Sequence, residues 1–358
     1  MSGNPIGVGF IGTGRISDLH AIEYLQSTEA RIVALADAEP ERARERAAAW
    51  RLGEVPVFAD YRALLERSDV DMVEILVPHH LHGPIAQAAF AAGKHVSLQK
   101  PMTLSLAEAD DLVARADAAG VAFKVFENFL FYPPVVKAKE LIGAGAIGEP
   151  LTIRIKANKG DPAYAWQVPA SATAWRQDAS RSGGSPLTFD DGHHKFALAW
   201  HFMGQAEEVH AWIGETRTDD GLVLDCPSLI SFRFPGGRLG NLEIVYSKDL
   251  QVLTRHYAMD DRIEITGSRG VLWVTRGHGR LGDAAPVILY ADGETRAYSD
   301  LETGWETSFV HSTRHFIEAL RAGSPPKLTG AEGREILRFA LAAQASAREG
   351  RAVRLGEL

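Results

Sequence analysis

Short apolar runs alternate with longer, alanine-rich stretches over the first third of the chain. Each run is brief and almost continuously apolar, which is typical of strands covered on both faces in a parallel sheet. Repetition of these strand and helix units predicts a doubly wound α/β domain at residues 1–126. The runs are Ile6–Ile11, Arg31–Ala36, Met72–Val77, His95–Leu98 and Ala122–Phe126.

The pattern changes after Pro133 and Pro134. A helical segment runs through Ile142, a glycine-punctuated turn follows, and Leu151–Lys156 is strand-like. Further along, alternating runs between Gly, Pro and Asp turns predict an antiparallel sheet, and a last helix is expected at about 332–348. We therefore expect an α+β domain at residues 127–358. Its later strand-like runs are Glu208–Ile213, Ser228–Phe234, Arg238–Tyr246, Arg262–Ile265, Val271–Val274 and Val287–Tyr290.

Composition narrows the class of protein. The 358 residues are 46% hydrophobic and 23% charged, as in ordinary folded globular proteins. The net charge of −8 is spread along the chain, which argues against a nucleic-acid partner. One cysteine, Cys226, permits no intrachain disulfide, and neither a signal-peptide pattern nor a run of about 18 apolar residues is visible. We expect a cytoplasmic protein that does not span a membrane.

A glycine-rich turn follows the first predicted strand and precedes a helix-compatible stretch. Its pattern is Gly-x-Gly-x-x-Ser, with Ser17 in place of a third glycine. The first glycine permits a tight turn, the second lets a pyrophosphate approach the backbone, and the helix N-terminus offers N–H groups. A plain strand-to-helix turn is the alternative. The residues expected at a dinucleotide are Gly12, Thr13, Gly14, Arg15 and Ile16.

Asp37 indicates which dinucleotide is favoured. It ends the second predicted strand, 23 residues after Gly14. A carboxylate there can accept hydrogen bonds from the ribose hydroxyls of NAD and would repel a 2′-phosphate. The nearby Arg42 lies inside a predicted helix. We therefore expect NAD rather than NADP; the alternative is an ordinary turn aspartate.

A polar corner follows the fourth apolar run. His95–Leu98 delivers Gln99 and Lys100 to the carboxyl end of a strand, where open α/β sheets bind ligands. Pro101 restrains Lys100 to extended geometry. A lysine in this place can hold a substrate hydroxyl or exchange a proton with it. Taken alone, such a lysine is more often simply solvated.

A second candidate centre precedes the apolar stretch Ala197–Met203. If this segment is helical, Asp190 and His194 share one face, so the carboxylate can orient the imidazole. Histidine titrates nearest neutrality and is a natural base for a hydroxyl proton. A metal site that includes His193 is the alternative. Adjacent histidines point about 100° apart on a helix and no further ligand cluster is visible, so we expect no metal.

Two further groups are weaker candidates. His79 and His82 follow the third apolar run, where they either border a cofactor or cap a helix. Trp175 and Arg176 lie in Asp161–Ser185, a polar stretch that we interpret as a loop over a pocket. An arginine beside an aromatic ring suits a hydroxylated or anionic ligand, and it suits surface packing equally well.

Together these motifs resemble the Gfo/Idh/MocA family of NAD(P)-dependent sugar and polyol dehydrogenases over essentially the whole chain. The resemblance implies an N-terminal Rossmann domain and a C-terminal domain on an open, mainly antiparallel sheet. It also implies a homodimer or homotetramer, since the family's sheet commonly packs against another subunit. The matching pieces are Gly12-Thr13-Gly14, Val77-Pro78-His79-His80-Leu81-His82, Ala92-Gly93-Lys94-His95-Val96, Gln99-Lys100-Pro101, Asn128 and Asp190-x-Gly192-x-His194.

The resemblance also implies roles for single residues. Lys100 and His194 would be the catalytic pair and Asp190 would position the substrate, which Trp175 and Arg176 are further candidates to contact. The residues implied in dinucleotide binding are Gly12, Thr13, Gly14, Arg15, Ile16, Asp37, Pro78, His79, His82, Gln99, Lys100 and Asn128.

Two positions depart from the family pattern. His79 stands where Asn is usual, so its contact with the cofactor can differ from the one that the family's Asn makes. Gln99 stands where Glu is usual and removes a negative charge beside Lys100, which should make the lysine easier to deprotonate. We hypothesise that Gln99 shifts the acid limb of activity toward lower pH.

The expected activity is reversible hydride transfer from a secondary hydroxyl of a sugar, cyclic polyol or glycoside to NAD. Two alternatives stay open at this point. One is redox-assisted cleavage of a glycoside, in which the cofactor is not consumed. The other is a catalytically silent regulator of the same fold that senses a sugar or dinucleotide.

Overall fold

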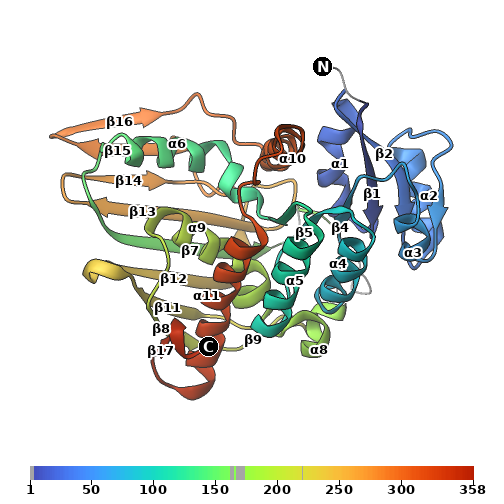
Figure 1. Cartoon of the computed structure of the whole chain (residues 1–358). Helices are drawn as coiled ribbons and strands as arrows, with labels where there is room; N and C mark the ends of the chain where they lie inside the picture. The colour runs from blue at the N-terminus through green and yellow to red at the C-terminus, as the bar shows by residue number, and fades with distance from the viewer. Residues whose placement is uncertain (1–3, 162–164, 167–173, 220) are drawn as a thin grey trace. The chain divides into compact units, whose positions relative to one another are not determined.

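The computed structural model describes residues 4–161, 165–166, 174–219 and 221–358 (Figure 1). The chain divides into two compact units, Met1–Asn128 with Phe309–Leu337, and Phe129–Ser308 with Arg338–Leu358. The first unit therefore takes up a late segment of the chain, which the sequence pattern does not predict. No helix among the described residues is long and apolar enough to cross a membrane.

The first unit contains a six-stranded parallel sheet in the order β3-β2-β1-β4-β5-β6. The predicted doubly wound fold is confirmed. The sequence pattern misses β3, because this strand has only two residues and both are half-buried. The order reverses between β1 and β4, so this switch point marks where such sheets bind ligands. The elements are β1 (Ile6–Ile11), α1 (Ser17–Gln26), β2 (Ala30–Ala36), α2 (Pro40–Ala49), β3 (Val57–Phe58), α3 (Tyr61–Leu65), β4 (Met72–Ile75), η1 (His79–Leu81), α4 (His82–Ala91), β5 (His95–Gln99), α5 (Leu106–Ala119) and β6 (Phe123–Phe126).

The late segment completes the core of the first unit. Phe316 and Ile317 of α10 (Trp305–Ala322) are buried against a cluster that includes Phe10 of β1 and Tyr24 of α1. Arg314 on the same helix forms hydrogen bonds of 2.9 and 2.8 Å with the Glu23 carboxylate. Burial of apolar surface is the main stabilising term here, so the segment is an integral part of the unit.

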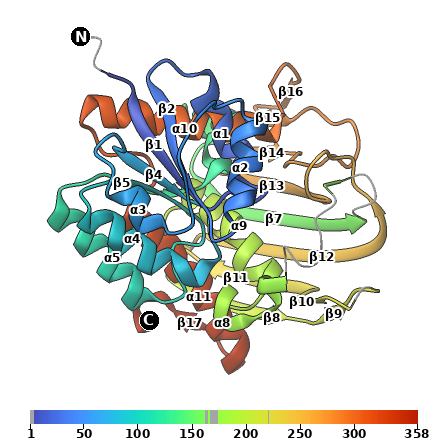
Figure 2. The same ribbon diagram turned by 90° about the vertical axis from the view of Figure 1, so that its right-hand side faces the viewer.

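The second unit is built on a nine-stranded sheet in the order β16-β15-β14-β13-β7-β12-β11-β8-β17. All neighbours are antiparallel except β7 and β12, which confirms the mainly antiparallel prediction. Helix α6 packs on β14 and β15 (Figure 1), and α9 packs on β7 (Figure 2). Strands β9 and β10 form a separate two-stranded sheet. The strands of the unit are β7 (Pro150–Asp161), β8 (Glu208–Ile213), β9 (Thr216–Arg217), β10 (Val223–Leu224), β11 (Ser228–Arg233), β12 (Leu239–Gln251), β13 (Met259–Gly267), β14 (Gly270–Val274), β15 (Val287–Ala291), β16 (Glu294–Tyr298) and β17 (Val353–Arg354).

The helical segments of the second unit include a π-helical turn, which the sequence pattern does not predict. This turn, η5, leads directly into α9. The segments are η2 (Asn128–Phe131), α6 (Pro133–Gly143), η4 (Ala174–Gln177), α8 (Ala179–Ser182), η5 (Pro186–Asp191), α9 (Gly192–Met203), η6 (Pro235–Gly237), α11 (Gly330–Glu349) and η7 (Leu355–Glu357), of which η2 and α11 begin in the first unit.

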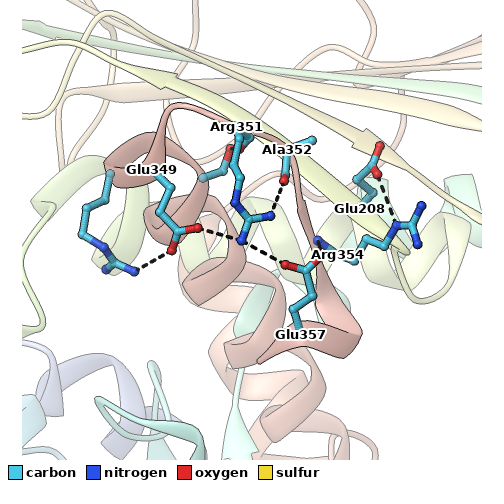
Figure 3. Close-up of polar contacts among 8 residues, drawn as sticks. Glu208, Glu349, Arg351, Ala352, Arg354 and Glu357 are labelled. Atoms are coloured by element: carbon cyan, nitrogen blue, oxygen red, sulfur yellow. Dashed lines mark hydrogen bonds and ion pairs between the residues drawn. The ribbon is translucent and has the colours of Figure 1, made fainter.

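Ion pairs hold the end of the chain beside the sheet edge (Figure 3). Arg351 lies 2.8 Å from a Glu349 oxygen and 3.0 Å from a Glu357 oxygen, and Arg354 lies 3.7 Å from Glu208 of β8. These side chains are largely exposed, so each pair contributes little by itself. They support the pairing of β17 with β8, which places the last strand at the edge of the sheet.

Candidate functional site

The glycine loop lies at the carboxyl end of β1, at the switch point of the parallel sheet. Gly12 has a φ of +90°, and a Cβ there would lie 2.4 Å from the carbonyl oxygen of Leu76, so only glycine fits. A Cβ on Gly14, by contrast, would meet no atom within 4 Å. The protein's own packing therefore requires Gly12. Gly14 leaves open space in front of the backbone, as a bound pyrophosphate needs.

Asp37 braces this loop from the end of β2. Its Oδ2 accepts hydrogen bonds of 2.8 Å from both the N–H and the hydroxyl of Thr13, and its Oδ1 accepts one of 2.9 Å from the N–H of Glu39. Arg42 lies 3.3 Å from Oδ1. These four donors match the acceptor capacity of a carboxylate. A ribose hydroxyl would therefore replace the long contact with Arg42, whose side chain is 42% exposed.

The polar corner after β5 lies at the same edge of the sheet. The Oε1 of Gln99 accepts a 2.9 Å hydrogen bond from the N–H of Lys100, and the peptide bond between Lys100 and Pro101 is cis. Lys100 is only 9% exposed. It is therefore not the solvated surface lysine that is common at such positions.

His82 joins two loops at this edge. Its Nδ1 lies 2.8 Å from the carbonyl oxygen of Pro101, and its Nε2 lies 3.0 Å from that of Val77. Burial lowers the pKa of His82 to about 4, although these carbonyl groups favour the protonated ring. The neutral ring thus ties the segment after β4 to the corner after β5, and the His79 ring lies beside it at 5.5 Å between centroids.

The remaining predicted cofactor residues also follow strands of the parallel sheet. They lie in the segments that follow β1, β4 and β6, and they are Arg15, Ile16, Pro78 and Asn128. The first unit thus brings all the predicted dinucleotide residues to the carboxyl ends of its strands or to the segments that directly follow them.

The second centre differs from the regular α-helix that the spacing suggests. Asp190 lies in the π-helical turn η5, where its N–H bonds to the carbonyl of Ser185, and His194 lies in the first turn of α9. Such π turns are frequent at functional sites. The spacing of four residues therefore spans a junction between two helix types, not one uniform face.

Asp225, which sequence reasoning missed, anchors the start of the π-helical turn η5. Its Oδ1 accepts a 2.7 Å hydrogen bond from the N–H of Leu187, and its Oδ2 accepts one of 2.7 Å from the N–H of Thr188. The hydroxyl of Thr188 bonds to the same Oδ2. The carboxylate satisfies backbone donors at the start of the turn, in the manner of a helix cap.

Asp190 forms an ion pair with Arg176. The Nε of Arg176 lies 2.9 Å from Oδ2 of Asp190, and the guanidinium carbon lies 4.5 Å from the centroid of the Trp175 ring. Burial lowers the pKa of Arg176, but the carboxylate outweighs it, so the pKa is raised overall. The structure therefore brings together Trp175, Arg176 and Asp190, which the sequence places in two separate motifs.

His194 is 8% exposed and packs edge-on against Phe129, with 5.0 Å between the ring centroids. Phe129 also lies near a buried charge cluster that sequence reasoning missed. The Nζ of Lys195 lies 2.7 Å from Asp191 and 3.2 Å from Asp261, and 5.7 Å from the Phe129 centroid. The signal in the sequence is a lysine directly before the apolar stretch of α9.

This cluster shifts the ionisation of its members. Burial raises the pKa of Asp261 to about 7, although Lys195 opposes the shift. Burial also lowers the pKa of His278 to about 3, and the neighbouring Lys195 charge adds to this effect. His278 is therefore neutral near pH 7.

No metal centre accompanies these residues within the part of the chain that the structure describes, where no group of three or more His, Cys, Asp or Glu side chains is arranged to hold an ion. The predicted loop Asp161–Ser185 is only partly described, since residues 162–164 and 167–173 lie outside the described residues.

Comparison with known proteins agrees with both units. Residues 6–127 match the family described as "Oxidoreductase family, NAD-binding Rossmann fold", and residues 139–355 match "Oxidoreductase family, C-terminal alpha/beta domain". A myo-inositol 2-dehydrogenase of Thermotoga maritima is 29% identical over 98% of this chain and 99% of its own length. A D-apiose dehydrogenase of Paraburkholderia graminis is 27% identical over 97% and 89%, respectively.

A solved structure shows the same fold. An oxidoreductase from Agrobacterium radiobacter, in complex with NAD⁺, L-tartaric acid and magnesium, aligns with a TM-score of 0.85 over 98% of this chain and 99% of its own, at 21% identity. Since the two family matches span most of its length, this chain belongs to the Gfo/Idh/MocA oxidoreductase family, with a NAD-binding Rossmann fold followed by a C-terminal α/β domain.

Proposed function

We propose that this protein is a dehydrogenase that transfers a hydride between a secondary hydroxyl of a sugar, cyclic polyol or glycoside and NAD. The observation that carries the proposal is the full-length similarity to two dehydrogenases, one named for a cyclic polyol and one for a sugar. The open space at Gly14 and the buried carboxylate of Asp37 fit a dinucleotide, which supplies a hydride acceptor when it is bound.

In this proposal His194 accepts the hydroxyl proton from the carbon that is oxidised. Imidazole suits this role because it titrates near neutrality. Lys100 and Asp190 hold neighbouring hydroxyls of the substrate, and the ion pair with Arg176 fixes the orientation of the Asp190 carboxylate. Lys100 and His194 thus act in the same reaction, and positioning is the main contribution of the protein.

The test of this function is anaerobic mixing with NAD and with NADP against inositols, aldoses, sugar acids and glycosides. Reduced nicotinamide absorbance and carbohydrate products are followed together. Equal amounts of reduced NAD and oxidised sugar are the expected result. An aglycone released without net reduction would favour redox-assisted cleavage instead. Tight NAD binding with no turnover on the whole panel would favour the sensor.

Cofactor preference can be tested at Asp37. The variant Asp37→Asn removes the negative charge that would repel the 2′-phosphate of NADP. The ratio of kcat/KM for NAD over kcat/KM for NADP should therefore fall by about 10-fold, which is the free-energy equivalent of about one pKa unit. The ratio cancels any general loss from the altered loop. Steady-state kinetics with both cofactors measures it.

Glu39→Gln is the matched control, because it removes the same charge two residues away, where the side chain is 71% exposed. Its ratio should change by less than about 3-fold, since screening by water weakens an exposed charge. An unaltered ratio in Asp37→Asn would contradict the role proposed for Asp37.

The sequence departure at Gln99 yields a pH prediction. A carboxylate in Gln99→Glu would lie beside Lys100, favour its charged form and move the acid limb of kcat to higher pH by about half a unit to one unit. Profiles of kcat between pH 5.5 and 9.5 measure the shift. Gln251→Glu adds the same charge at an exposed position on β12 and should leave the profile in place. Superimposable profiles for wild type and Gln99→Glu would remove the hypothesis.

We further propose a cytoplasmic homodimer or homotetramer. One face of the sheet carries exposed apolar side chains, among them Trp212 of β8 and Leu229 of β11, which lie directly opposite each other, and Leu239 of β12. Neighbouring exposed apolar residues on a sheet face support an interface with a second copy. Light scattering during gel filtration tests this, and a monomer of 38.9 kDa would contradict it.

A further inference from the structure

The first unit contains a buried chain of polar side chains that the proposed mechanism does not use. The hydroxyl of Tyr24 donates a 2.7 Å hydrogen bond to one oxygen of Glu74, and Nδ1 of His20 lies 3.2 Å from the other. The Nε2 of His20 lies 3.3 Å from the side-chain nitrogen of Gln99. Tyr24, Glu74 and His20 are each at most 3% exposed. Burying a polar group costs free energy unless it forms hydrogen bonds, and each of these side chains has a hydrogen-bond partner.

The hydrogen bonds of Gln99 determine where the protons lie along this row of hydrogen-bonded side chains. Because the oxygen of Gln99 accepts the N–H of Lys100, the NH₂ group of Gln99 faces His20 and can only donate. The Nε2 of His20 must then be the acceptor, so Nδ1 carries the proton and donates to Glu74. Burial, followed by the Glu74 charge, raises the pKa of Tyr24, which keeps its hydroxyl a donor. One protonation pattern satisfies every group.

Aromatic packing fixes the His20 ring in this orientation. The ring centroid lies 4.0 Å from that of Phe126 on β6 and 5.3 Å from that of Phe309 on α10. Besides Lys100, the charged groups that act on these side chains include Glu23 on α1, which is bonded to Arg314 and raises the pKa of Tyr24, and Lys124 on β6, which interacts electrostatically with Glu74. The ring of His20, which lies on α1, is therefore held by Glu74 of β4, Gln99 of β5 and the Phe126 ring of β6.

We propose that the chain Tyr24–Glu74–His20–Gln99 is a positioning device for Lys100. The inference rests on the catalytic role proposed for Lys100 above. His20 holds the amide of Gln99, and the amide oxygen holds the N–H of Lys100, so the main chain that carries the lysine is anchored to the buried core. His20 does not touch the reacting atoms. Its effect is on geometry, where a displacement of about 1 Å can cost roughly 100-fold in rate.

A matched pair of variants at His20 separates positioning from packing. In His20→Asn the short amide still donates to Glu74 but ends before Gln99. In His20→Gln the longer side chain places an acceptor near the former Nε2. Both lose the aromatic ring. We expect His20→Asn to lower kcat by about 10-fold with KM for the substrate changed by less than about 3-fold, and His20→Gln to recover most of the loss.

A double-mutant cycle tests whether His20 and Gln99 act as one unit. Gln99→Met keeps the size of the side chain and removes both of its hydrogen bonds, so its kcat should fall by a similar factor. The double variant His20→Asn/Gln99→Met should be no slower than either single variant, because each cuts the same chain. Losses that multiply in the double variant would overturn the proposal.

A measurement without substrate keeps this inference separate from the proposed function. Amide hydrogen exchange at Lys100, read by NMR in the absence of ligands, should speed up at least about 10-fold in His20→Asn and stay near the wild-type rate in His20→Gln. The ¹⁵N shifts of the His20 ring should report a neutral ring protonated at Nδ1. Equal exchange in the two variants, or a proton on Nε2, would overturn the positioning chain even in an active enzyme. A protein that turns over no sugar or polyol, yet shows these signals, would refute only the proposed function.

Discussion

The His194→Ala variant is expected to turn over its substrate at least about 100-fold more slowly than the wild type, and the same loss is expected for Lys100→Met. In the proposed mechanism His194 is the base for the hydroxyl proton, and proton transfer by a positioned group contributes about 10²–10⁴-fold. Lys100→Met keeps the length of the side chain and removes the amine that is proposed to hold the substrate. Pre-steady-state formation of reduced nicotinamide measures the step itself, apart from product release.

Two control variants make this comparison specific. His201→Ala removes a histidine from the same helix, α9, and Lys248→Met removes a lysine whose side chain is 61% exposed. Both should keep turnover within about 3-fold of the wild type. NAD binding to His194→Ala, followed by fluorescence, should also be unchanged, since His194 is not among the predicted dinucleotide residues. Retention of full activity in both Lys100→Met and His194→Ala would rule out the proposed catalytic pair.

Local patterns predicted most of the fold because both sheets consist of strands with readable burial. The strands of the parallel sheet are nearly all apolar, and those of the second sheet alternate, as β13 shows from Met259 to Gly267. Strands of two residues, such as β3 and β17, carry no pattern of their own. The return of Phe309–Leu337 to the first unit depends on contacts such as Phe316 in the core around Phe10, which no local window contains.

The candidate site divides in the same way. Motifs confined to a few residues, such as the glycine loop, could be predicted from the sequence because the residues that set the backbone geometry and the residues that carry the chemistry lie in one turn. Partnerships between distant positions could not. Glu74 pairs with His20, which lies 54 residues earlier in the sequence, and Lys195 of α9 pairs with Asp261 of β13. In each case the sequence offers only a charged residue within or beside an apolar run, a sign that it is buried but not of its partner.

The largest effect on stability is expected from Lys195→Met. The lysine is fully buried, and its charge is balanced by Asp191 at 2.7 Å and Asp261 at 3.2 Å. Methionine fills a similar volume but leaves two carboxylates facing each other without a cation. Removing one partner of a buried ion pair costs about 3–5 kcal/mol. Chemical denaturation at pH 8, followed by tryptophan fluorescence, measures the loss in the free energy of unfolding.

The cost of Lys195→Met should shrink as the pH falls. Burial already raises the pKa of Asp261 to about 7 in the presence of the lysine, and removing the lysine raises it further. In the variant the folded state therefore binds more protons than the unfolded state between about pH 4 and pH 7. Stability of the variant then rises as the pH falls through this range. The deficit against wild type should be largest at pH 8 and clearly smaller at pH 5.5.

Two comparisons isolate the buried charge as the cause. Lys156→Met makes the same substitution at an ion pair with Glu243 on the exposed sheet face, where the lysine is 46% exposed, and it should cost less than about 1 kcal/mol at either pH. Lys195→Met/Asp261→Asn removes one of the two stranded carboxylates, so part of the loss at pH 8 should be recovered. If the deficit of Lys195→Met is the same at pH 5.5 and pH 8, packing and not charge is what Lys195 contributes.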